Sequence, residues 1–99
     1  MSVNPNQYTN WVNLGNIYSA FTSFGIDKSY ETGMLAYKRA EVLNPKNPLI
    51  LLLEAQLEVN NKNTSSALDL VNKALALKPD YADALKFKNS LQGSQAPAN

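Results

Sequence analysis

Two acidic side chains have the spacing that acid–base chemistry would use. Glu54 and Glu58 are four residues apart in a segment of helical periodicity, so their carboxylates share one side of a helix. Nothing else of that chemistry converges on them, and we expect a solvated face or a contact between Glu58 and Lys62 instead. The eight serines have no His to activate them, and no Gly-rich phosphate loop is present. The sequence therefore predicts that the protein is not an enzyme.

The composition argues against most other kinds of site. The 99-residue chain has no Cys and no His, which removes disulfides, thiolate nucleophiles and zinc sites of the Cys/His type. Nine basic and eight acidic residues give a net charge of +1 without a basic stripe, and a solvated helix face explains Lys86 and Lys88. We expect no cofactor, no metal and no nucleic-acid partner.

Membrane insertion of this fragment is not expected either. The longest apolar run, 49–53, has five residues, whereas a spanning helix needs about 20. The first seven residues are polar and lack the basic-then-apolar pattern of a signal peptide. The sequence thus favours a soluble fragment, and a cytoplasmic location over others.

Three prolines reveal an internal period. Pro45 and Pro79 are 34 residues apart, and Pro5 and Pro45 are 40 apart, which is six more. Each proline lies between the expected end of one helix and the expected start of another. A fixed period of this length indicates stacked helix pairs, because one pair cannot bury its apolar face alone.

The segment between Pro45 and Pro79 predicts two amphipathic helices. Asn47-Pro48 is a start signal, since Asn caps helices and Pro is tolerated at the first helical position. The polar run 60–63 predicts a turn. After it, Ala67, Val71 and Ala74 recur at helical spacing, with small residues where two helices would approach closely.

The segment between Pro5 and Pro45 shows the same plan in lengthened form, with a first helix through Trp11 and a second starting near 27–29. The six additional residues fall in the turn 22–27. We expect Phe24 and Ile26 of this turn to fold back over the helix pair and extend its core. The alternative is a loop that contacts a partner.

These residues carry a family resemblance. Trp11-x-x-Leu14-Gly15-x-x-Tyr18, then Gly33-x-x-x-Tyr37-x-x-Ala40 and Pro45, resembles one tetratricopeptide repeat (TPR) with a lengthened turn. Ala55, then Ala67-x-x-x-Val71-x-x-Ala74 and Pro79, resembles a second. Repeat two departs from the signature, because it has Leu51, Glu54 and Glu58 in place of Trp, Leu and Tyr.

The resemblance implies an all-α fold, a TPR-type α-solenoid of five helices with a right-handed superhelical path. Repeat one spans about 6–45, repeat two about 47–79, a capping helix about 81–92 and a flexible tail 93–99. Small residues such as Gly15 would let helices approach, and large ones such as Leu14 and Tyr37 would fill the spaces between them. Because residues 4–7 resemble the end of a preceding repeat, we expect an excised piece of a longer protein.

The resemblance also implies where a partner would bind. In TPR proteins the first helices of successive repeats line a concave groove that holds a peptide or helix. Here the groove residues would be Val12, Asn16, Ser19, Leu49, Leu52, Gln56, Val59 and Lys86. Leu49 and Leu52 favour binding, because apolar residues on an open face are usually covered. For Asn16, Gln56 and Lys86, an exposed scaffold surface explains the residues equally well.

One TPR subclass grips a chaperone's C-terminal carboxylate with Lys and Asn side chains. Asn16 and Lys86 would suit that ligand, but the other expected positions hold Val12, Leu53 and Asp83, and Asp83 would repel a carboxylate. We therefore predict a different protein or peptide partner. The main alternative is a structural spacer or a self-association segment of a larger protein, with a homodimer filling the groove. Association of that larger protein with the cell envelope belongs to this alternative. A regulatory domain on an envelope enzyme is a third.

Overall fold

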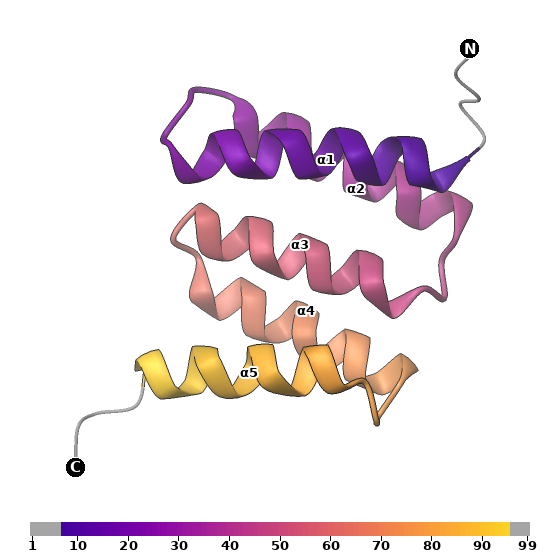
Figure 1. Ribbon diagram of the computed structural model, residues 1–99, viewed down its shortest axis with the longest axis vertical. Coiled ribbons are helices and arrows are strands. Elements are labelled where there is room, and N and C mark those ends of the chain that lie inside the picture. Colours follow the sequence, from indigo (N-terminus) through magenta and orange to yellow (C-terminus); the bar gives the residue numbers. More distant parts are fainter. Residues whose placement is uncertain (1–6, 96–99) are drawn as a thin grey trace.

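The computed structural model describes residues 7–95, with side chains as far as Gln92. Within that range the chain is all-helical and has no strand, as the sequence predicts. The five helices are α1 (Tyr8–Ser23), α2 (Ser29–Leu43), α3 (Pro48–Asn60), α4 (Thr64–Leu77) and α5 (Ala82–Gln95). In Figure 1, α1, α3 and α5 form a front layer, α2 and α4 lie behind it, and consecutive helices run in opposite directions.

The helices pack mainly against their neighbours in the chain. α1 contacts α2 to make a first pair, and α3 contacts α4 to make a second pair. The pairs meet where α3 contacts both α1 and α2, and α5 packs on α4. The second pair therefore has a helix on each side, whereas one side of the first pair is open in the described chain.

Two helix boundaries follow from local chemistry. At the start of α3, the Leu49 N–H donates to Asn47 Oδ1 at 3.0 Å, and Pro48 occupies the first turn. This cap confirms the predicted start signal. α5 continues to Gln95, so the predicted tail does not begin at 93. Residues 96–99 of that tail, and 4–6 of the predicted preceding repeat, lie outside the described residues.

The main hydrophobic core lies in the second pair and α5. It consists of the buried residues Leu51, Leu52, Ala55, Ala67, Leu70, Val71, Ala74, Ala84 and Leu91. Alanines let the helix backbones approach, and leucines fill the space between them. Full burial of one such Leu or Val side chain stabilises a fold by about 1.5–3 kcal/mol. α5 completes this core through Ala84 and Leu91.

The first pair is held by close contact and hydrogen bonds. A Cβ atom added to Gly15 would lie 2.4 Å from Tyr37 Cε1, so only glycine fits beside the tyrosine ring. The Tyr37 hydroxyl donates to Asn16 Oδ1 at 2.6 Å, and Thr22 Oγ1 donates to Ser29 Oγ at 3.0 Å. These contacts confirm the predicted role of Gly15 in bringing two helices together.

The connection between α1 and α2 differs from the expectation. Phe24 is 79% exposed and Ile26 is 49% exposed, so the expectation that they fold back into the core is wrong. The cause is a helix C-terminal motif: Gly25 has a φ of 75°, its N–H donates to Thr22 O, and the Ile26 N–H donates to Phe21 O. This motif turns the backbone sharply at the helix end and leaves both side chains outside.

Candidate partner-binding surface

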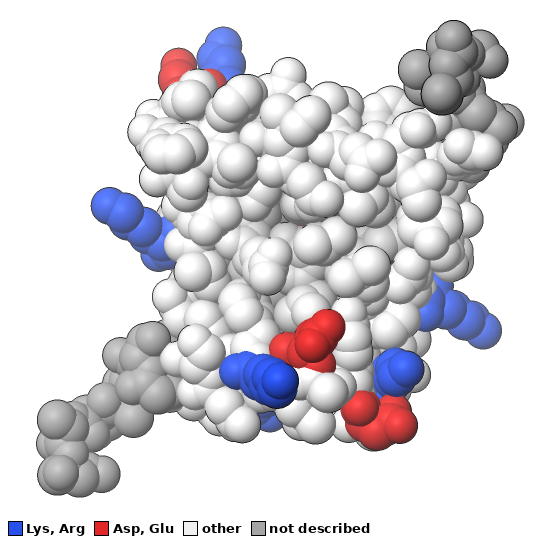
Figure 2. All heavy atoms as spheres, in the orientation of Figure 1, with Lys and Arg blue, Asp and Glu red and all other residues white. Residues whose placement is uncertain are grey.

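The front layer of the molecule presents an uncharged surface over α1 and α3, which we call the front face and define as the exposed surface of these two helices seen in Figure 2. α1 contains no Asp, Glu, Lys or Arg, and the only ionisable groups of α3, Glu54 and Glu58, are buried. In Figure 2 the surface over α1 and α3 accordingly carries no charge, and charged side chains occur at the rim and over α5.

Amide side chains at the α1–α3 contact are fixed in orientation. Asn60 Nδ2 donates to Ser19 O at 3.0 Å and to Ser19 Oγ at 2.9 Å. Because the Tyr37 hydroxyl donates to Asn16 Oδ1, the Asn16 amide presents its Nδ2 as a donor. Asn60 conversely presents its Oδ1 as an acceptor. Asn16 and Ser19, the residue that Asn60 contacts, lie one turn apart on α1.

Burial of Tyr37 reinforces this arrangement. Desolvation raises the pKa of Tyr37 to about 12, with a smaller contribution from the nearby Glu54 carboxyl and an opposing one from Ser19. The hydroxyl therefore stays protonated and remains a donor to Asn16 at physiological pH. The orientation of the Asn16 amide is thus set by a hydroxyl group that does not titrate near physiological pH.

The predicted groove residues divide into three groups. Asn16, Leu49, Gln56 and Lys86 are exposed, and Val12 is half-buried. Ser19 is only 8% exposed because it faces Asn60, so it supports the surface without forming it. Leu52 is 5% exposed, so the prediction that it lines an open groove is wrong. Val59 is half-buried and packs partly against the core.

The error at Leu52 has a physical reason. Periodicity places Leu49, Leu52 and Val59 on adjacent faces of one helix, but it does not say which face the neighbouring helices cover. In the folded chain Leu52 belongs to the same buried cluster as α4 and α5 residues. Leu49, one turn earlier, stays 42% exposed.

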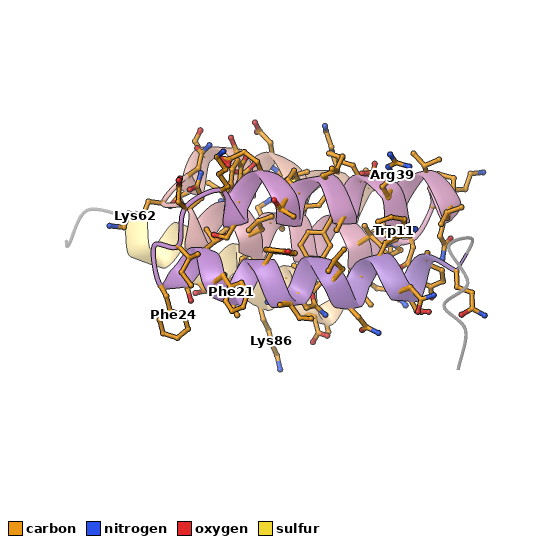
Figure 3. All side chains as sticks on the ribbon, turned by 90° about the horizontal axis from the view of Figure 1, so that it is seen from above. Trp11, Phe21, Phe24, Arg39, Lys62 and Lys86 are labelled. Atoms are coloured by element: carbon orange, nitrogen blue, oxygen red, sulfur yellow. The ribbon has the colours of Figure 1, made fainter. Side chains whose placement is uncertain are left out.

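Sequence reasoning also missed residues that the fold places at this surface. Asn60 was predicted as part of a turn, although it follows Gln56 by one helical turn. Figure 3 shows Phe21, Phe24 and Lys86 extending to the same side of the molecule. Aromatic side chains at the end of α1 therefore lie at the border of the front face.

Glu54 and Glu58 do not lie on a solvated face. Glu54 is 0% exposed and Glu58 is 7% exposed, so the expected solvated face and the expected contact with Lys62 are both wrong. Their hydrogen-bond partners are Lys38 and Tyr30, which come from α2. The two carboxylates therefore lie behind the front face.

Comparison with protein-family models, with curated proteins and with solved structures finds no match for this chain. Among residues 7–95, no helix combines the length and the apolar character needed to cross a membrane.

Proposed function

We propose that this chain is a protein-interaction module that holds an uncharged partner segment on its front face. The observation that carries the proposal is the absence of charged side chains over α1 and α3, a surface of two helices in a chain that is 17% charged. The centres of protein interfaces are depleted in charged residues, because charges are costly to desolvate when they become buried.

The chemistry of the exposed side chains defines the partner. Leu49 and the half-buried Leu53 offer apolar contact, while Asn16 and Gln56 offer amide groups. Amide side chains such as Asn16 and Asn60 carry both a donor and an acceptor, which suits the N–H and C=O groups of a peptide backbone. The expected partner is a peptide or helix with apolar and neutral polar side chains.

The spacing of Pro45 and Pro79 and the order of helix contacts support a TPR-type α-solenoid as the finer description of the fold. In such an arrangement the first helices of each repeat, α1 and α3, would line the concave side and continue onto α5. The front face would then be the groove, with Lys86 as its basic edge.

A peptide-display selection tests the proposal. A random peptide library is panned against the folded protein, and the affinity of recovered peptides is measured for the wild type, Asn16→Arg and Asn72→Arg. The arginine at position 16 places a charge on the front face. Asn72 is exposed on α4, in the rear layer, so it is the matched control.

We expect recovered peptides of low net charge, at least tenfold weaker binding to Asn16→Arg and unchanged binding to Asn72→Arg. Selection of strongly acidic or basic peptides would contradict the proposal. An equal loss in both variants would contradict it as well.

A second observation favours self-association as the alternative function. Leu14, Ile17 and Phe21 recur at helical spacing on α1 and are 37%, 52% and 39% exposed. The prediction that Leu14 fills the space between helices is therefore wrong at this position. Figure 3 looks onto the first pair from its open side, where no further helix of the described chain covers α1. Exposed apolar patches of this kind mark contacts between chains.

Sedimentation equilibrium over a range of concentrations tests this alternative. We call Leu14, Ile17 and Phe21 the apolar stripe of α1. If this stripe joins two copies of the chain, the wild type forms a dimer that Ile17→Arg dissociates. Leu35→Arg is the matched control, because Leu35 is 59% exposed on α2 and is not part of the stripe. A monomeric wild type at every concentration would reject self-association.

A further inference from the structure

The two helix pairs meet at a cluster of three charged side chains behind the front face. Glu54 of α3 is 0% exposed, and Lys38 Nζ of α2 donates to its Oε1 at 2.9 Å. The same ammonium group donates to Glu41 Oε1 of α2 at 3.4 Å. One lysine therefore faces two carboxyl groups, one of them fully buried, where α2 contacts α3.

The charges of this cluster balance only when one of the carboxyl groups carries a proton. Two carboxylates beside one ammonium would leave a negative charge at a buried site, which is costly. Glu41 and Glu54 also hydrogen-bond to each other, which requires a proton on one of them. Glu54 Oε2 is buried and has no donor among the described residues, so a proton on this oxygen would make it the donor to Glu41.

The surroundings of Glu54 do not supply a second cation that would replace the proton. The other titratable groups that face the cluster are Tyr30 and Tyr37 of α2, Glu58 of α3, and Asp69 and Lys73 of α4. α1, which also contacts α3, contains no Asp, Glu, Lys or Arg. In the described part of the chain, Lys38 alone forms an ion pair with Glu54.

Loss of this proton should move the helices, because water does not reach the ionised group in the closed structure. A cavity of about 380 Å³ lies between α2, α3 and α4, but Glu54 Oε2 is closed off from it. Burial, with a contribution from Glu41, raises the pKa of Glu54 to about 7, so the proton is held below that pH and lost above it. Solvation of the ionised carboxylate then requires α2 and α3 to move apart.

The contact between the pairs is suited to such a movement. Within the second pair, α3 is the helix that contacts both α1 and α2. Near the carboxyl end of α3, the Tyr30 hydroxyl donates to Glu58. At that end, Asn60 also donates to Ser19. Glu54 lies nearer the middle of α3, so the pairs can part at Glu54 while these bonds hold the end of the helix.

We propose that the proton shared by Glu41 and Glu54 is a switch that holds the two helix pairs together and so regulates the front face. The front face spans α1 of the first pair and α3 of the second, and parting of α2 from α3 separates its two halves. Partner binding is therefore strong while the proton is held and weak once it is lost. The effect on binding rests on the proposed function, whereas the movement of the pairs does not.

Distances between spin labels test the movement without a partner. The chain has no Cys, so two introduced cysteines are the only thiols to label. Leu35→Cys with Asn72→Cys joins exposed positions of α2 and α4 across the junction, and Gln56→Cys with Asn72→Cys is the control within the second pair. We expect the Leu35–Asn72 distance to lengthen between pH 5.5 and pH 8.5 and the Gln56–Asn72 distance to stay constant. A constant distance across the junction, or an equal change in both, would overturn the switch.

Variants of the labelled protein assign the movement to the carboxyl pair. Glu54→Gln keeps a neutral side chain of the same size and should hold the short distance at both pH values. Glu31→Gln, at an exposed position on α2, should leave the pH response unchanged. If Glu54→Gln does not fold, Glu41→Gln decides: burial still raises the pKa of Glu54, but without the contribution of Glu41 the midpoint should fall. A midpoint that does not move would overturn the shared proton.

Binding of selected peptides links the movement to the front face. Peptides without titratable side chains, recovered by display at pH 5.5, should bind the wild type at least tenfold more weakly at pH 8.5. They should bind Glu54→Gln equally at both pH values. A distance change without any recovered peptide would refute the proposed function and leave the switch intact. Equal binding at both pH values with a constant distance would refute the switch and leave the proposed function intact. Equal binding despite a distance change would overturn the regulation of the front face.

Discussion

The first helix pair places a glycine against a tyrosine ring, whereas the second pair meets through alanines, leucines and a valine. The first pair adds hydrogen bonds from Tyr37 and Thr22, and it leaves the apolar stripe of α1 exposed. The second pair buries a cluster of apolar residues that α5 completes, although Leu49 and Leu77 stay exposed. The second pair and α5 therefore contain the larger apolar cluster, while the first pair leaves apolar surface of α1 exposed.

The two pairs should differ most in how much unfolding free energy they lose when a leucine is replaced by alanine. Leu70 is buried in the second pair, and Leu70→Ala should destabilise the protein by about 2–5 kcal/mol through lost burial and a residual cavity. Leu14 of the first pair is 37% exposed, so Leu14→Ala should cost less than about 1 kcal/mol. Urea unfolding monitored by circular dichroism measures both. Equal costs would show that the open side of α1 is covered in solution.

The junction between the pairs should respond to pH. Burial, with a further contribution from the Glu41 carboxyl, raises the pKa of Glu54 from 4.5 to about 7, although Lys38 opposes the shift. The folded state therefore holds the proton more tightly than the unfolded state. The resulting stability is fully present below pH 4.5 and is lost as the pH rises through about 7. The loss should be on the order of 3 kcal/mol.

Denaturant unfolding at pH values from 4 to 8 checks this expectation. Glu54→Gln should remove most of the decline, whereas Glu31→Gln, at an exposed position on α2, should keep it. Glu54 lines a cavity between α2, α3 and α4. The other titratable groups that line this cavity are Tyr30, Lys38, Glu58, Asp69 and Lys73. The pKa of Glu41 is lowered, mainly by its hydrogen bond with Glu54, which adds an opposite slope at the acidic end. A wild-type curve that is flat between pH 5 and 7 would contradict a buried, protonatable Glu54.

Local features of the fold were predictable from the sequence, and non-local burial was not. The helix cap at Asn47 and Pro48 depends on local backbone chemistry. The contact of Gly15 with Tyr37 depends on one close approach between two helices. By contrast, the hydrogen-bond partners of the buried Glu54 and Glu58 lie far away in the chain. Lys38 is 16 positions before Glu54, and Tyr30 is 28 positions before Glu58. Helical periodicity gives the side of α3 on which they lie, but it does not identify Lys38 and Tyr30 as their partners.

The candidate site shows the same limit. Asn16 and Gln56, which the resemblance predicts to be groove residues, are exposed. Leu52 was misplaced, because it is buried in one cluster with residues of α4 and α5. Asn60 was missed because its role depends on Ser19, which lies 41 residues earlier in the chain. Hydrogen bonds over such separations carry no periodic signal in the sequence.

The smallest expected effect concerns the contact that defines the first pair. Gly15→Ala would place a Cβ atom 2.4 Å from the Tyr37 ring, which is buried and held by Asn16, so the ring or a helix must shift. Such overpacking costs about 1–3 kcal/mol, and the better helix propensity of alanine returns about 1 kcal/mol. The net loss should be about 1–2 kcal/mol in urea unfolding.

Gly33→Ala is the matched control, because it makes the same change one helix away. Its Cβ would lie 3.1 Å from Tyr18 Cβ and 3.3 Å from Leu57 Cδ2, contacts that a shift of a few tenths of an ångström relieves. The helix propensity of alanine then offsets most of the cost, and the stability should change by less than about 1 kcal/mol. If both variants proved neutral, α1 and α2 would tolerate a wider separation. The first pair would then owe its packing to hydrogen bonds more than to the glycine–tyrosine contact.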